Sequence, residues 1–168
     1  MPDSGRAISN TSPLFYLHRI NALHLLPALY EQIIIPTAVV AELQAGAAQG
    51  EDVPDLSAYD WINQRHAAIP DDLKLIADLG RGEAEVIALA FQFPDTPVIL
   101  DDRFARRIAA RYALKLTGTI GVLLKAKSAG LIPLVSPLLD EMQRAGFHLS
   151  EVVKHSALQL SGEKSIIR

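Results

Sequence analysis

The chain has 168 residues, of which 49% are hydrophobic and 21% are charged, and it contains no cysteine. This length fits one domain that buries roughly 70% of the surface its unfolded chain exposes, and the lack of thiols excludes a disulfide framework and a thiolate zinc site. The formal net charge of −3 gives no overall attraction for nucleic acid, so a nucleic-acid function must depend on local charge.

The N-terminus has no basic tip before an apolar run, and no stretch approaches the roughly 18 uninterrupted apolar residues of a membrane span. We therefore expect no signal peptide and no transmembrane helix. The chain is expected to be cytoplasmic and to form a single domain over residues 1–168.

The N-terminal half alternates short apolar runs with segments of helical period. Residues 6–10 predict a first strand, after which Ser12 suits a helix N-cap and Pro13 the first helical position. Residues 14–30 predict two short helices interrupted near Asn21. The other elements expected in this half are a buried strand at 32–35, a helix from Pro36 to about Gln44, a loop at 46–56 and an edge strand within 61–69.

The C-terminal half continues the alternation. Its expected elements are helices at 70–79 and 83–93, a buried strand at 97–100, a helix at 102–112, a strand at 114–117, and helices at 118–129, 137–145 and 150–160. Strands that alternate with helices of about ten residues indicate βαβ units, and hence a mainly parallel sheet with helices on both faces. In such sheets, functional sites form beyond the carboxyl ends of the strands.

Polar side chains gather at those positions. Asn10, Asp101 and Asp102 fall at or just past predicted strand ends, while Glu42 and Glu83 lie on helices that follow a strand or a turn. Each also has a structural explanation. Asp102 can cap the next helix, Glu83 lies in a first helical turn that favours an anion, and Glu42 can be a solvated helix residue.

Taken together, these residues indicate a cation site. Two carboxylates about 4 Å apart repel by roughly 4 kcal/mol at an effective dielectric constant near 20. Three acids that converge on one rim therefore need protonation or a bound cation. A donor set made only of oxygen favours Mg²⁺ or Mn²⁺ over zinc, and such an ion would polarise a phosphate and activate water for phosphodiester hydrolysis.

The segments ISNTSPL, VVAEL, GRGEAEVIALA, VILDDRFARR and TGTIGVLLKAKSAGLI follow one another within about residues 7–162. As an ordered set they resemble the PIN domain family, most closely an uncharacterised prokaryotic subgroup related to VapBC-type toxin nucleases. The resemblance implies a three-layer α/β/α sandwich with a central sheet of four or five strands, ending in helices at about 137–160. It also implies RNA cleavage dependent on Mg²⁺ or Mn²⁺, a toxin–antitoxin role with an antitoxin partner, and homodimers.

The resemblance assigns the family's four acidic positions to Asn10, Glu42, Glu83 and Asp102, with Asp101 beside the last. It implies that the four acids of this set are catalytic and that all five side chains hold the metal. A helix N-cap is the alternative role for the nearby threonines. The residues implied as accessory are Thr11, Ser12, Thr117 and Thr119.

Asn10 departs from the family pattern, which has aspartate there. An amide oxygen can ligate Mg²⁺, but it carries no charge and cannot accept a proton as a base. We therefore expect reduced metal affinity and turnover. The alternative function is a catalytically degenerate PIN domain that binds RNA or a protein partner, and a phosphatase is disfavoured because no nucleophilic aspartate motif is present.

A basic stripe adjoins the acids. Arg103, Arg107 and Arg111 repeat every four residues, with Arg106 adjacent, and they form either a solvated helix face or a surface that gathers RNA phosphates. Glu85 is a weaker site candidate, because it lies about 200° around the helix from Glu83.

Overall fold

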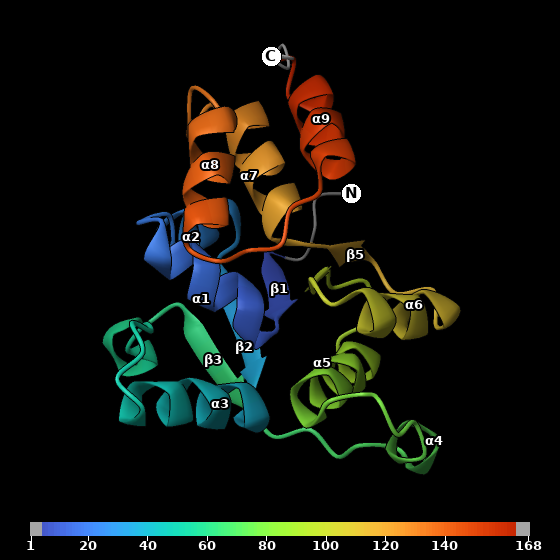
Figure 1. Ribbon diagram of the computed structural model, residues 1–168. Coiled ribbons are helices and arrows are strands. Elements are labelled where there is room, and N and C mark those ends of the chain that lie inside the picture. Colours follow the sequence, from blue (N-terminus) through green and yellow to red (C-terminus); the bar gives the residue numbers. More distant parts are fainter. Residues whose placement is uncertain (1–4, 164–168) are drawn as a thin grey trace.

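The structure, a computed structural model, describes residues 5–163 (Figure 1). Its centre is a five-stranded, entirely parallel sheet in the order β3-β2-β1-β4-β5. The strands are β1 Arg6–Ser9, β2 Gln32–Pro36, β3 Ile62–Arg65, β4 Val98–Ile99 and β5 Leu116–Thr117. This arrangement confirms the predicted α/β/α sandwich.

Helices cover both faces of the sheet; α7, α8 and α9 lie above it and α3 and α5 below it in the view of Figure 1. The described helices are α1 Thr11–Arg19, α2 Leu25–Leu29, α3 Thr37–Ala48, α4 Asp71–Lys74, α5 Arg81–Gln92, α6 Arg103–Arg111, α7 Thr119–Ser128, α8 Ser136–Arg144 and α9 Glu151–Leu160, with a short 3-10 helix η1 at Leu56–Ala58. No helix within residues 5–163 has the length and apolar character needed to cross a bilayer.

The inner strands are buried on both faces, as their β-branched composition predicts. Ile33, Ile34 and Ile35 of β2 have no exposed surface, and neither do Val98 and Ile99 of β4. Fully burying one such side chain stabilises a fold by roughly 1.5–3 kcal/mol. These strands therefore anchor the core and hold the sheet edge that carries the polar residues.

The direction of winding reverses beside β1. From β1 the chain moves outward to β2 and β3, and it then returns to place β4 on the other side of β1. In open α/β sheets, the crevice at such a reversal is where ligands bind. Asn10 directly follows β1, and Asp101 comes two residues after β4, so both stand at this crevice.

Several predicted helix boundaries were wrong, among them the start of α5, which is Arg81 and not residue 83. Helix α1 begins at Thr11, so Asn10 and not Ser12 occupies the N-cap position, and Pro13 is tolerated because first-turn amides need no intrahelical acceptor. Helix α3 continues through Gly46 to Ala48, where Gly46 leaves room for the carboxylate of Glu51 as the chain turns back.

The predicted helix at 70–79 shortens to α4, Asp71–Lys74. Leu73 is 1% exposed but Leu75 is 84% exposed, so the segment buries too little apolar surface to hold a longer helix. The predicted break near Asn21 is confirmed, because this residue adopts a φ of 55°, which asparagine tolerates better than most side chains.

Candidate active site

Asn10 lies at the centre of the candidate site. Its side chain is buried, with 4% of its surface exposed, and its Nδ2 donates a hydrogen bond to Oε1 of Glu83 at 3.3 Å. Its Oδ1 is also buried and has no hydrogen-bond partner among the described residues. The nitrogen faces Glu83 because an amide oxygen in that place would repel the carboxylate. An orphaned buried oxygen of this kind could serve as a cation ligand.

Glu42 reaches the same space from α3. The residue is exposed as a whole, yet its carboxylate lies against Gly82 of α5. A Cβ atom at Gly82 would stand 2.6 Å from Oε1 of Glu42 and 3.3 Å from Oδ1 of Asn10. Because glycine has no side chain, a space remains between these two oxygen atoms, either of which could ligate a cation. The hydroxyl of Thr11 donates to the other oxygen of Glu42 and orients the carboxylate.

The electrostatics of this opening favour a cation. Burial raises the pKa of the Glu42 carboxyl above its ordinary value, and the negative charges of Glu83 and Glu85 raise it further. The hydrogen bond from Thr11 lowers the same pKa, but it does not cancel the rise. A bound divalent ion would relieve this repulsion.

Asp101 has a different environment. It accepts hydrogen bonds from Oγ of Ser12 at 2.8 Å, from the backbone amide of Thr119 at 2.8 Å and from Oγ1 of Thr119 at 2.6 Å. Ser12 belongs to α1 and Thr119 begins α7, so Asp101 joins the first turns of two helices at the end of β4. The Asp101 carboxylate therefore connects α1 and α7 at the carboxyl edge of the sheet, which is called the rim below.

Asp102 takes the role of a helix cap. Its Oδ1 accepts from the backbone amide of Ala105 at 2.8 Å, and the residue occupies the N-cap position of α6. The N-cap of α7 is Gly118 and not a threonine, so the cap role weighed for Thr117 and Thr119 is wrong. The backbone carbonyl of Thr117 instead accepts from Arg106.

The structure therefore divides the predicted residues into three groups. Asn10 and Glu42 border the opening at Gly82, and Glu83 joins them through its hydrogen bond with Asn10. Asp101 connects α1 with α7, and Asp102 caps α6. Within residues 5–163, no three histidine, aspartate or glutamate side chains lie close enough together to form a metal site by themselves. Two carboxylates, an orphaned amide oxygen and a space free of side chain nevertheless fit an oxygen-liganded divalent cation.

A family model described as a PIN domain, DUF3368, matches residues 6–163. The chain belongs to the PIN domain family. Among solved structures, the chain is similar to a PilT N-terminus domain protein from the hyperthermophilic archaeon Sulfolobus solfataricus. The similarity has a TM-score of 0.51 at 18% identity, covers 86% of this chain and 99% of the archaeal chain, and shows the fold. No curated protein matches the chain.

Glu85 of this PIN domain has a role that the sequence did not reveal. Its carboxylate, in a residue 2% exposed, accepts from the backbone amide of Ala38 at 3.3 Å and from Nε of Arg81 at 3.1 Å. Helix α3 has no side-chain cap of its own, and Glu85 of α5 supplies one. The contact joins the helices that carry Glu42 and Glu83. The feature of the sequence that could have indicated this role is the position of Glu85, an acidic residue next to the apolar run that continues α5.

The predicted basic stripe is partly altered. Arg103, Arg107 and Arg111 are exposed on α6. Arg106 instead donates from one guanidinium nitrogen to the carbonyl of Leu100 at 2.7 Å and to that of Thr117 at 2.9 Å. It thus ties the ends of β4 and β5 together, and the surface stripe of the PIN domain consists of the other three arginines.

Proposed function

We propose that this PIN domain is a divalent-metal-dependent endoribonuclease in which Asn10, Glu42 and Glu83 hold one Mg²⁺ or Mn²⁺. Membership of the PIN family supports a nuclease module that uses divalent metal and interacts with nucleic acid. The observation that carries the proposal is the opening at Gly82, where the Oε1 of Glu42 and the orphaned Oδ1 of Asn10 border a space that any Cβ atom would fill.

Each residue then has a defined task. Asn10 supplies a neutral ligand from Oδ1 while its Nδ2 orients Glu83, and Thr11 orients Glu42. A bound divalent ion would supply Lewis-acid polarisation of the scissile phosphate and of a water molecule. Asp101 keeps the first turns of α1 and α7 in place, which preserves the shape of the rim.

The charge pattern supports a nucleic-acid substrate held along α6. The helix begins beside the rim, and Arg103, Arg107 and Arg111 follow it on the exposed face. Arginine guanidinium groups bind phosphates in this way without reading sequence. Because the chain's net charge is −3, attraction for a polyanion must come from local groups such as this stripe.

The proposal is tested by incubating the purified protein with Mn²⁺ and a labelled single-stranded RNA, alongside a DNA of the same sequence. We expect cleavage of RNA by the wild type, loss of about 100-fold or more in Glu42→Gln, and wild-type rates in Glu141→Gln, which changes an exposed carboxylate of α8. If the protein binds Mn²⁺ but does not cleave RNA, the nuclease proposal is wrong and a non-catalytic binding module is supported. If only the DNA is cleaved, the proposal that RNA is the substrate is wrong.

The proposal extends to the toxin half of a toxin–antitoxin pair, on the basis of the family subgroup that the sequence motifs resemble. Induced expression in a host should arrest growth, and co-expression of the product of the neighbouring upstream reading frame should relieve the arrest. Arrest that persists in Glu42→Gln would show that growth inhibition does not come from the proposed chemistry.

A further inference from the structure

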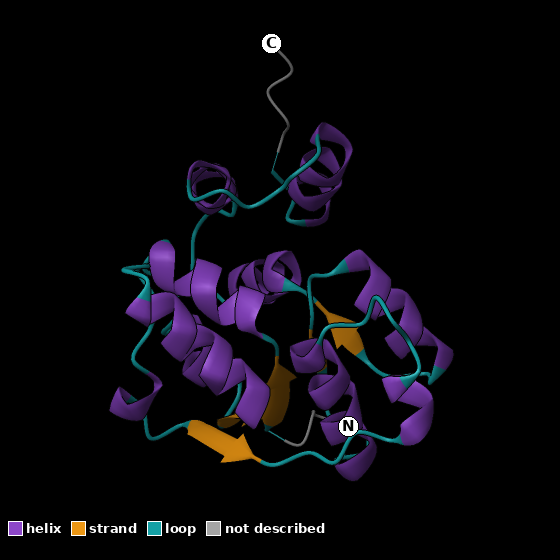
Figure 2. Cartoon of the chain, turned by 60° about the horizontal axis from the view of Figure 1, so that its bottom comes forward, coloured by secondary structure: helices purple, strands orange, loops and turns teal. Residues whose placement is uncertain are grey.

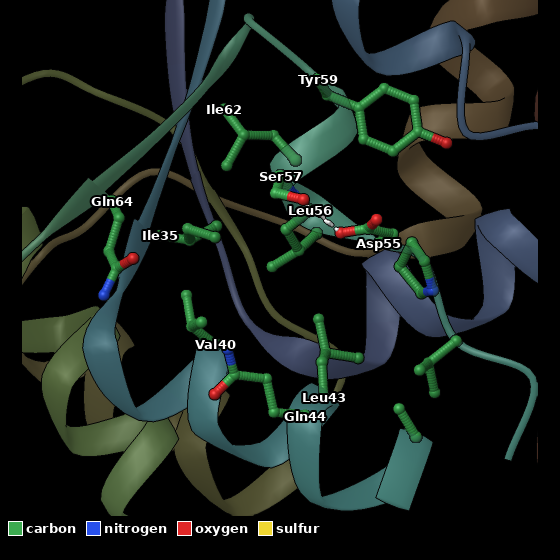
Figure 3. Close-up of a pocket in the computed structure, with 13 residues that line it drawn as sticks. Ile35, Val40, Leu43, Gln44, Asp55, Leu56, Ser57, Tyr59, Ile62 and Gln64 are labelled. Carbon is green, nitrogen blue, oxygen red and sulfur yellow. Dashed lines mark hydrogen bonds between the residues drawn. The ribbon is translucent and has the colours of Figure 1, made fainter. Parts of the chain in front are cut away.

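A second hollow lies on the other side of α3 from the candidate site. The pocket has a volume of about 580 Å³ and lies between α3, strand β3 and the loop of residues 51–60 (Figure 3). Its walls are mainly apolar side chains, among them Ile35, Val40, Leu43, Leu56 and Ile62. Pockets of about 300–1,000 Å³ with such walls are typical of binding sites.

Helix α3 separates this pocket from the acidic site. Val40, Gln44 and Ala47 line the pocket, whereas Glu42 lies about 200° around the helix from Val40 and reaches Gly82. No candidate metal ligand lines the pocket. A molecule bound there would not need the nuclease chemistry.

One border of the pocket is the free edge of the sheet. Strand β3 is the last strand in the order β3-β2-β1-β4-β5, and its outer side is open in Figure 2. Ile33 pairs with Ile62, and its amide donates to the carbonyl of Trp61 at 2.9 Å. In this parallel register, the peptide groups of Ile62 and Gln64 point away from β2. The side chains of these same two residues line the pocket.

The other border is acidic. The loop of residues 51–60 contains four carboxylates, all on exposed residues, and neither lysine nor arginine: Glu51, Asp52, Asp55 and Asp60. The basic side chains that face the loop come from α1, where His18 contacts the Asp52 carboxylate at 2.9 Å and Arg19 donates to the Asp52 carbonyl at 3.2 Å. The other three carboxylates of the loop have no basic partner among the described residues.

We propose that this pocket and the free edge of β3 bind an extended peptide that carries an apolar side chain flanked by lysine or arginine. The outward peptide groups of Ile62 and Gln64 specify a strand as the occupant, because they need backbone donors and acceptors at strand spacing. The pocket receives the apolar side chain, and the acidic loop attracts the flanking cations. A second copy of this chain is disfavoured, because two acidic loops would repel each other.

Trp61, the only tryptophan of the chain, reports on occupancy. Its ring lies 5.1 Å from that of Tyr59, which lines the pocket. The probe is a capped heptapeptide with a central leucine between two valines and lysines at both ends. We expect saturable quenching or a shift of Trp61 emission, weakened by salt. A peptide with glutamates in place of the lysines, and one N-methylated at alternate amides, should each bind about tenfold or more weakly.

Two neighbouring alanines provide a matched pair of variants. Ala47 and Ala48 are both exposed near the end of α3, but only Ala47 lines the pocket. We expect Ala47→Arg to weaken binding about tenfold and Ala48→Arg to change it less than about twofold. Gln64→Pro removes an outward amide without removing a bond to β2, and it should also weaken binding.

Specific results would overturn the proposal. These are no emission change with the wild type, equal binding by Ala47→Arg and Ala48→Arg, or undiminished binding of the N-methylated peptide. Thermal melting and circular dichroism of the variants establish that each is folded before binding is compared.

Discussion

Asn10 donates a hydrogen bond from its side-chain Nδ2 to Glu83 at 3.3 Å, while its side-chain Oδ1 has no hydrogen-bond partner within residues 5–163. This Oδ1 is buried beside the opening at Gly82. One amide thus both stabilises a carboxylate and leaves an unsatisfied acceptor next to it. The residue type matters for this pairing, because an aspartate at position 10 would face Glu83 with like charge.

Asn10→Asp should therefore change stability and metal affinity in opposite directions. Without metal, we expect a loss of about 1–3 kcal/mol, since a hydrogen bond becomes a repulsion. Mn²⁺ should bind about tenfold or more tightly, since one negative charge is added. Melting curves with and without Mn²⁺ measure both effects, and Mn²⁺-dependent RNA cleavage should rise in parallel. Equal cleavage by wild type and variant would refute the argument about charge.

Gly82→Ala should close the opening. The new Cβ atom would stand 2.6 Å from Oε1 of Glu42, so we expect Mn²⁺ affinity, measured by calorimetry, to fall about tenfold or more. Alanine is favoured over glycine within a helix by about 1 kcal/mol, so the fold itself should not be weakened. Gly46→Ala is the control, because its Cβ would meet a carboxylate oxygen of Glu51 at 2.7 Å and not an oxygen of a proposed metal ligand. Similar losses in both variants would contradict the role of Gly82.

Glu85→Leu should weaken the junction of α3 with α5. The buried amide of Ala38 would lose its acceptor, and we expect the free energy of unfolding, measured in urea, to fall by about 1–3 kcal/mol. Glu85→Gln keeps an acceptor oxygen for Ala38 and should lose less. If glutamine and leucine destabilise equally, the amide contact is not what Glu85 contributes.

Arg106 and Arg107 should respond differently to alanine. Arg107→Ala should lower RNA affinity and reduce the slope of log affinity against log salt by about 1, with a stability change below about 0.5 kcal/mol. Arg106→Ala removes donors to two strand-end carbonyls and should cost about 1–3 kcal/mol of stability. Filter binding across a salt series and urea unfolding separate the two. Equal salt slopes in wild type and Arg107→Ala would remove this residue from the RNA surface.

Glu163, which follows α9 and contacts the start of α8, should make the free energy of unfolding depend on pH. Burial alone would raise the pKa of its carboxyl, but hydrogen bonds from the amides of Val135 and Ser136 and from Ser161 and Lys127 lower it to about 2. Because the folded-state pKa lies below the ordinary 4.5, the stabilisation is complete above pH 4.5 and disappears as the pH falls toward 2.

Glu163→Gln measures this effect. At pH 7 the variant should be less stable than the wild type by roughly 2 kcal/mol, and the difference should shrink steadily between pH 4.5 and pH 2. Urea unfolding at pH 7, 4.5 and 3 provides the comparison. A difference that stays constant over this range would show that the charge of Glu163 is not the source.

The elements of the fold could be predicted from the sequence wherever local pattern and burial agree. The isoleucine run of β2, the alternation of strands and helices, and the break at Asn21 are local properties that tertiary structure did not override. Short segments with little buried surface were predicted less well, as the shortening of the expected 70–79 helix to Asp71–Lys74 shows. Propensity alone does not hold such a helix.

By itself, the sequence determined the residue types and the sheet edge at which Asn10, Glu42, Glu83 and the two aspartates gather. Only the tertiary structure decided which of these face the opening at Gly82, because a carboxylate turns toward whichever donors packing brings near it. The cap that Asp102 provides for α6 is local and could be anticipated, but Asp101 accepts from Thr119 and Glu85 accepts from the Ala38 amide of α3, and such contacts between distant segments leave no periodic trace in a sequence.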